Sequence, residues 1–184
     1  MTSLLNQLIA RAARYLYLRR HRKMWEDIPQ DPVSVSNLYV ELDDRQLGLR
    51  MYHGNADKPM VIYAHGGGFV VGNLDSELGA CLTLCRGLGV VVVSVDYRLA
   101  PETPFPGGLE DCYAALTWTH DNAASLKVDP ERVAVLGMSA GGGLSAATAL
   151  LARDRGGPAI CFQYLGIPEL DYRLNTASMR EFVD

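Results

Sequence analysis

Three absences limit what this 184-residue chain can be. It contains no run of 18 or more apolar residues, so the sequence implies no membrane-spanning helix, which needs about 20. Its 4 cysteines include no Cys-x-x-Cys pair, so we expect small buried side chains and predict no metal site. No histidine follows His120, so these residues offer no late histidine as a catalytic base.

Acidic residues are absent from residues 1–25, which hold six of the 17 Lys and Arg residues. The remainder therefore carries 11 basic and 21 acidic side chains, and this mild acidity argues against nucleic acid as a partner. The apolar stretch 4–10 is short, is interrupted by polar residues and has its positive charge on the wrong side for a secretory signal. A cytoplasmic location is therefore predicted.

Helix and strand patterns alternate along the chain. Residues 4–25 predict an amphipathic helix with an apolar side, and an acidic linker ends at residue 32, which separates a unit 1–32 from a main unit 33–184. The predicted strands are 33–42, 47–52, 60–64, 90–95, 132–137 and 159–165, and the main-unit helices are 76–88, 106–122 and 140–152. Strands of Val, Leu and Ile separated by helices indicate an α/β fold, with a mostly parallel sheet covered on both faces.

A serine stands where one of these strands gives way to a helix. The apolar residues 133–136 lead into Gly137-Met138-Ser139-Ala140-Gly141, which has the pattern Gly-x-Ser-x-Gly of a nucleophile elbow. A serine on such a turn projects its hydroxyl beyond the carboxyl edge of the sheet, and the small residues two positions away let strand and helix pass closely. Ser139 is therefore the predicted nucleophile, with an ordinary turn serine as the alternative.

A glycine-rich loop follows another buried strand. Residues 65–69 read His-Gly-Gly-Gly-Phe and come directly after the apolar residues 60–64. Such a loop supplies one half of an oxyanion hole, and the amide that follows the nucleophile, here that of Ala140, supplies the other. A flexible turn is the alternative interpretation.

Taken with residues 95–102 (Val-Asp-Tyr-Arg-Leu-Ala-Pro-Glu), these motifs resemble those of the hormone-sensitive-lipase-type esterases of the α/β-hydrolase superfamily, in the family's order and spacing. The likeness runs from about Val33 to the last residue. One departure is Met138, where many relatives have Asp. The resemblance implies an α/β-hydrolase fold with about six of the expected eight strands present, and makes the amino-terminal helix a cap. The alternatives for that helix are a mitochondrial presequence and a membrane-surface or packing role.

The resemblance also implies roles for single residues. Gly67 and Gly68 would donate their amides to an oxyanion, and Phe69 and Val70 would line the substrate pocket, although a core role for them stays open. Asp75 would line the pocket or cap the helix that begins near residue 76.

Two polar groups receive structural roles at this stage. His65 is expected to hold the glycine-rich loop, with a role as base the alternative. We expect the charged and aromatic side chains of residues 95–102 to form a structural polar cluster.

The implied activity is hydrolysis of short to medium acyl esters through a serine acyl-enzyme, with no metal and no organic cofactor. In the family the catalytic Asp and His lie in a carboxyl-terminal portion that would begin after Asp184, so this chain is expected to carry the nucleophile and the oxyanion hole only. A missing segment or a second chain would supply the other two groups, and the 184 residues alone would be inactive or very weak. The alternative is a non-catalytic small-molecule-binding protein, or an inactive truncated member, with the same fold.

Overall fold

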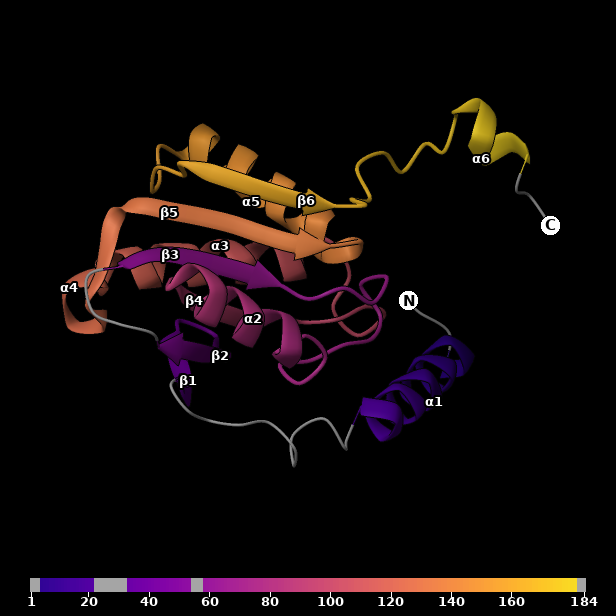
Figure 1. The fold of residues 1–184 in the computed structure, drawn as a ribbon. Coiled ribbons are helices and arrows are strands. Elements are labelled where there is room, and N and C mark those ends of the chain that lie inside the picture. The colour runs from indigo at the N-terminus through magenta and orange to yellow at the C-terminus, as the bar shows by residue number, and fades with distance from the viewer. Residues whose placement is uncertain (1–3, 22–32, 54–57, 182–184) are drawn as a thin grey trace.

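The computed structural model describes residues 4–21, 33–53 and 58–181, and within them one mixed sheet forms the centre of the fold (Figure 1). Its strands are β1 (Ser34–Leu42), β2 (Arg45–His53), β3 (Lys58–Ala64), β4 (Val91–Asp96), β5 (Val128–Met138) and β6 (Phe162–Gly166). They lie in the order β1-β2-β4-β3-β5-β6. The pairs β1–β2 and β2–β4 are antiparallel, and the other three pairs are parallel. The predicted α/β class and mostly parallel sheet are confirmed.

Helices cover both faces of this sheet, and the structure describes six of them. The described helices are α1 (Leu4–His21), α2 (Leu78–Leu88), α3 (Gly107–Asp121), α4 (Ala123–Leu126), α5 (Ala140–Arg155) and α6 (Ala177–Glu181). Helix α2 covers one face, and α3 and α5 cover the other (Figure 1). β5 starts four residues before its predicted start, because Val128 pairs with Lys58 across a register irregularity.

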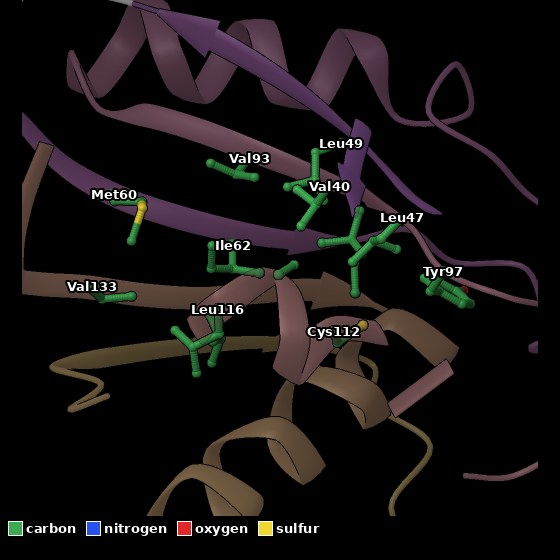
Figure 2. Close-up of a cluster of buried hydrophobic side chains, with 14 of the residues drawn as sticks. Val40, Leu47, Leu49, Met60, Ile62, Val93, Tyr97, Cys112, Leu116 and Val133 are labelled. Carbon is green, nitrogen blue, oxygen red and sulfur yellow. The ribbon is translucent and has the colours of Figure 1, made fainter. Parts of the chain in front are cut away.

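Alternation of side chains along the strands creates two separate cores. Met60 and Ile62 belong to a cluster with α3 residues such as Leu116, whereas Val61 and Tyr63 belong to a cluster with α2. Figure 2 shows the first cluster, in which labelled side chains from β1, β2, β3, β4 and β5 converge on α3. Because both faces are buried, these strands are apolar at nearly every position, which is the pattern that made them readable in the sequence.

Three of the four cysteines belong to the buried cores. Cys81, Cys85 and Cys112 are buried and Cys161 is exposed, so the prediction that all four are buried is wrong for Cys161. The reason is its place directly before β6, a strand at the edge of the sheet, where Phe162 and Tyr164 are also about half exposed or more. None of the described helices is long and apolar enough to cross a membrane.

Helix α1 lies beyond the carboxyl ends of the parallel strands, beside the loops that follow β3 and β4 (Figure 1). Its packed side chains are not those of the predicted apolar side: Leu8, Ile9 and Leu16 are more than half exposed, whereas Ala10 is buried. The side chain of Leu5 and the predicted linker from residue 22 lie outside the described residues. The Arg14 side chain of this helix donates hydrogen bonds to carbonyls of both loops.

Candidate functional site

Ser139 occupies the sharp turn between β5 and α5. Its backbone has φ 55° and ψ −122°, a conformation that a non-glycine residue adopts only at a cost of order 1–3 kcal/mol. The turn is held by two backbone hydrogen bonds: the Ser139 amide donates to the Gly166 carbonyl at 2.8 Å, and the Gly143 amide donates to the Ser139 carbonyl at 3.1 Å. The predicted elbow is therefore present, with its serine on a strained and well-anchored backbone.

The two elbow glycines leave no room for a side chain. A Cβ atom on Gly141 would lie 2.1 Å from the Ala64 carbonyl oxygen and 2.6 Å from that of His65. A Cβ atom on Gly137 would lie 2.3 Å from the backbone of Gly141. The expected close approach of strand and helix is confirmed, and it brings the start of α5 against the end of β3, where the glycine-rich loop begins.

His65 holds that loop from inside the protein. Its ring is fully buried, stacks on Tyr97 at 4.1 Å between centroids, and donates from Nδ1 to the Gly66 carbonyl at 2.8 Å. The Tyr97 hydroxyl in turn donates to the His65 carbonyl at 2.7 Å. Gly72, at φ +113°, approaches so closely that a Cβ atom there would lie 2.2 Å from Nδ1. These contacts support the structural role expected for His65.

Hydrogen bonds to the loop carbonyls decide where the loop amides point. Because a peptide unit is planar and trans, a carbonyl held on one side directs the amide of the next residue to the other side. The bond to the Gly66 carbonyl therefore orients the Gly67 amide, and bonds from Val70 and Val71 to the Gly67 carbonyl, at 3.1 and 3.0 Å, orient the Gly68 amide. In the described part of the chain, neither glycine amide donates to another group.

Ala140 supplies a third oriented amide. Its peptide unit includes the Ser139 carbonyl, which accepts from Gly143, and Ala140 is the first residue of α5, where an amide has no acceptor within the helix. The N-terminal end of a helix also favours negative charge. The arrangement can therefore stabilise an oxyanion next to the Ser139 hydroxyl.

Glu169 was missed by the sequence analysis, yet its side chain contacts the predicted nucleophile. The Ser139 hydroxyl donates to Glu169 Oε1 at 3.0 Å, and the Glu169 amide lies 3.4 Å from the Ser139 carbonyl. A signal was available, because β6 is the parallel neighbour of β5 and the loops after both strands emerge at the same edge. The carboxylate fixes the rotamer of the serine in this structure.

Of the three predicted pocket residues, Phe69 and Val70 are consecutive, whereas Asp75 makes its contacts elsewhere. Phe69, at φ +61°, packs partly against the core beneath α3, and Val70 follows it at the loop. Asp75 instead accepts a hydrogen bond from Arg50 at 2.8 Å and lines a hollow of about 200 Å³ near the end of β4. It does not cap α2: that helix begins at Leu78, and its N-cap residue makes no side-chain capping bond.

The charged and aromatic side chains of residues 95–102 make structural contacts, but not as one cluster: Tyr97 stacks on His65, Glu102 pairs with Arg14, and Arg98 binds a carboxylate that was not foreseen. Asp111 of α3 is fully buried and accepts from the Arg98 amide at 2.8 Å and from Arg98 Nε at 2.9 Å. Arg45 donates to the same carboxylate from Nε and Nη2, at 2.9 and 2.6 Å. Two guanidinium groups thus compensate one buried carboxylate, which fixes the loop after β4 against α3.

A larger hollow, of about 570 Å³, lies between the end of α5 and the start of β6. It is at the amino ends of the parallel strands, whereas Ser139 is at their carboxyl ends. Within the described residues, no group of three or more His, Cys, Asp or Glu side chains is placed to hold a metal ion.

Buried and neutral, His65 makes stability depend on pH. Burial lowers the pKa of His65 to about 4, from an ordinary value near 6.5. Because the folded pKa lies below the unfolded one, the unfolded chain binds the proton first, so this stability is present above pH 6.5 and is lost as the pH falls toward 4. We expect the His65 contribution to the free energy of unfolding to fall by about 3 kcal/mol across this range.

Urea unfolding between pH 7 and pH 4 measures this effect. His65→Gln should flatten the pH dependence relative to the wild type. Equal slopes for the wild type and His65→Gln would contradict the prediction.

Known proteins resemble the chain in both sequence and structure. A family model described as alpha/beta hydrolase fold matches residues 61–184. The chain is 40% identical over 172 residues to Esterase LipI of Mycobacterium tuberculosis, covering 89% of this chain and 54% of that protein. It is 49% identical over 126 residues to Carboxylesterase NlhH of Mycobacterium tuberculosis, covering 68% of this chain and 40% of that protein. The solved structure of a bacterial heroin esterase superposes with a TM-score of 0.89 at 44% identity, over 95% of this chain and 57% of that one. The chain thus spans about half the length of these relatives.

Proposed function

Because this chain belongs to the alpha/beta hydrolase fold family, we propose that it carries the nucleophile of a carboxylic ester hydrolase that works through a covalent acyl-serine intermediate. One observation carries the proposal: the strained Ser139 elbow faces the same sheet edge as three amides whose partner carbonyls are already bonded. Its named relatives are esterases and carboxylesterases, which supports the same reaction class.

The proposed chemistry has two halves. Ser139 Oγ attacks the ester carbonyl carbon and loses its proton to a base, and the resulting oxyanion accepts hydrogen bonds from the amides of Gly67, Gly68 and Ala140. Collapse of this intermediate releases the alcohol, which takes the proton, and leaves the acyl group on Ser139. Water then attacks the acyl carbon by the same route and releases the carboxylic acid. No step uses a metal or an organic cofactor.

None of the described histidine side chains is assigned as the base. His65 is buried, neutral and bonded to its own loop. His53 ends β2, which runs antiparallel to β4, and His120 ends α3, which returns to the start of the next parallel strand, so both lie at the opposite edge from Ser139. The side chain of His21 lies outside the described residues.

We further propose that α1 acts as a cap at the site and that Phe69 and Val70 contribute to the acyl pocket. The position of α1 beside the glycine-rich loop supports this assignment. A pocket role is less well supported for Asp75, since its carboxylate is paired with Arg50. A cytoplasmic location remains a prediction from the sequence.

A chain-length series of p-nitrophenyl esters tests the proposal on the full-length gene product. We expect turnover with a maximum at short to medium acyl chains and no activation at an oil interface. A maximum at long chains with interfacial activation would reject the substrate class, because it would indicate a lipase. Saturable ester binding with no turnover would instead favour the small-molecule-binding alternative.

A further inference from the structure

A single arginine of α1 ties together the two loops that flank the proposed site. Arg14 Nε donates to the Val70 carbonyl at 2.7 Å, and Arg14 Nη2 donates to the Ala100 carbonyl at 2.6 Å. The same Nη2 lies 2.7 Å from Glu102 Oε2, and this pairing lowers the pKa of Glu102, which keeps the carboxylate ionised. The Arg14 side chain is only 24% exposed, so the bonds to the carbonyls are partly shielded from water.

The Val70 carbonyl that Arg14 binds begins a short series of peptide units that are joined by hydrogen bonds. The amide at the other end of that peptide unit, on Val71, donates to the Gly67 carbonyl at 3.0 Å. The Gly67 carbonyl in turn shares its peptide unit with the Gly68 amide. Two hydrogen-bonded peptide units, 70–71 and 67–68, therefore connect Arg14, which is always charged, to the amide of the proposed oxyanion donor Gly68.

Hydrogen bonds in such a series strengthen one another, because each donor polarises the peptide that accepts from it. The charge on Arg14 makes the Val71 amide a stronger donor, and this in turn makes the Gly68 amide a stronger donor toward an oxyanion. The same bonds also fix the planes of both peptide units. A parallel link crosses to the second loop, because the Ala100 amide donates to the Phe69 carbonyl at 2.8 Å.

We propose that Arg14 is a positioning residue for the oxyanion hole, which couples the docked helix α1 to the Gly68 amide through the peptide units 70–71 and 67–68. The inference rests on the proposed esterase function for its catalytic consequence. Its structural part, the ordering of the loop by Arg14, can be tested whether or not the protein hydrolyses esters. The effect belongs to the transition state, because an oxyanion accepts a stronger hydrogen bond than an ester carbonyl does.

Kinetics of Arg14→Gln in the full-length protein test the catalytic part. Loss of an oxyanion donor itself costs about 10²–10³ in kcat, and for this indirect loss we expect a decrease of about tenfold with KM changed less than about twofold. The inhibition constant of a trifluoromethyl ketone, which forms a tetrahedral oxyanion on the serine, should rise in the same proportion. Arg14→Lys should restore most of kcat, since its ammonium can donate to one of the two carbonyls.

Arg11→Gln is the matched control, because Arg11 is an exposed arginine one turn earlier on the same helix. It should leave both kcat and the inhibition constant unchanged. An Arg14→Gln variant that changes KM alone, or that lowers the melting temperature with kcat intact, would overturn the catalytic part and assign Arg14 to substrate contact or to stability.

Amide hydrogen exchange at Val71 and Gly68 supplies a measurement that needs no activity. Exchange at Val71 should be faster in Arg14→Gln than in the wild type and in Arg11→Gln, because the held peptide unit is released. Equal rates in all three proteins would overturn the inference. If the wild type hydrolyses no ester, the proposed function fails, and the exchange rates still decide whether Arg14 orders the loop.

Discussion

Ser139→Ala is expected to lower kcat for ester hydrolysis by roughly 10⁶-fold in the full-length gene product, the scale seen when a serine protease loses its nucleophile. The reason is that the covalent route then disappears, while the oxyanion donors and the binding pocket remain. Steady-state hydrolysis of a short p-nitrophenyl ester measures the loss. Labelling by a fluorophosphonate probe should disappear in parallel, and mass spectrometry of the wild type should place the adduct on Ser139.

Ser125→Ala is the control for this experiment, since Ser125 is an exposed serine of α4 near the start of β5, at the far edge of the sheet. It should keep full turnover and full labelling. An adduct on another serine, or undiminished hydrolysis by Ser139→Ala, would contradict the assignment of the nucleophile.

Gly141→Ala is expected to reduce the free energy of unfolding by about 3 kcal/mol, or to prevent folding altogether. The added methyl group would lie 2.1 Å from the Ala64 carbonyl oxygen, and both atoms belong to backbones that cannot move independently of β3 and α5. Any shift that relieves the contact would also displace Ser139 from the glycine-rich loop, so turnover should fall more than stability alone explains. Urea unfolding and ester hydrolysis measure the two effects.

Gly79→Ala is a matched control, because Gly79 is the second residue of α2 just as Gly141 is the second residue of α5. Nothing lies within 4 Å of a Cβ atom at Gly79, so alanine should leave stability unchanged or raise it by up to about 1 kcal/mol. A similar small effect for both substitutions would show that the elbow tolerates a side chain, contrary to the prediction.

The chemical core of the site could be located from the sequence because its signals are local. The small residues at 137 and 141 and the strand before them are adjacent in the chain, and the structure places Ser139 on the elbow they predict. The strands were recognisable because both faces of the sheet are buried, which requires apolar residues at successive positions. The chemical roles of Ser139 and the three amides remain proposals.

The residues that the sequence analysis missed make their contacts across long separations. Arg14 and Val70 are 56 residues apart, and Ser139 and Glu169 are 30 apart. No periodicity or motif links a charged residue on a helix to a carbonyl in a distant loop. For the same reason the sequence analysis did not single out Asp111, although it anchors two arginines in the structure.

The sequence by itself thus determined the α/β class, the order of most elements and the position of the elbow, because apolar periodicity and glycine sterics act over a few residues. Tertiary structure decided which face of α1 packs, that Asp75 pairs with Arg50 rather than capping α2, and which carbonyls orient the loop amides. These outcomes depend on which polar groups come within hydrogen-bonding distance once the sheet has brought distant loops to one edge. Residues that are neighbours in the sequence do not determine those distances.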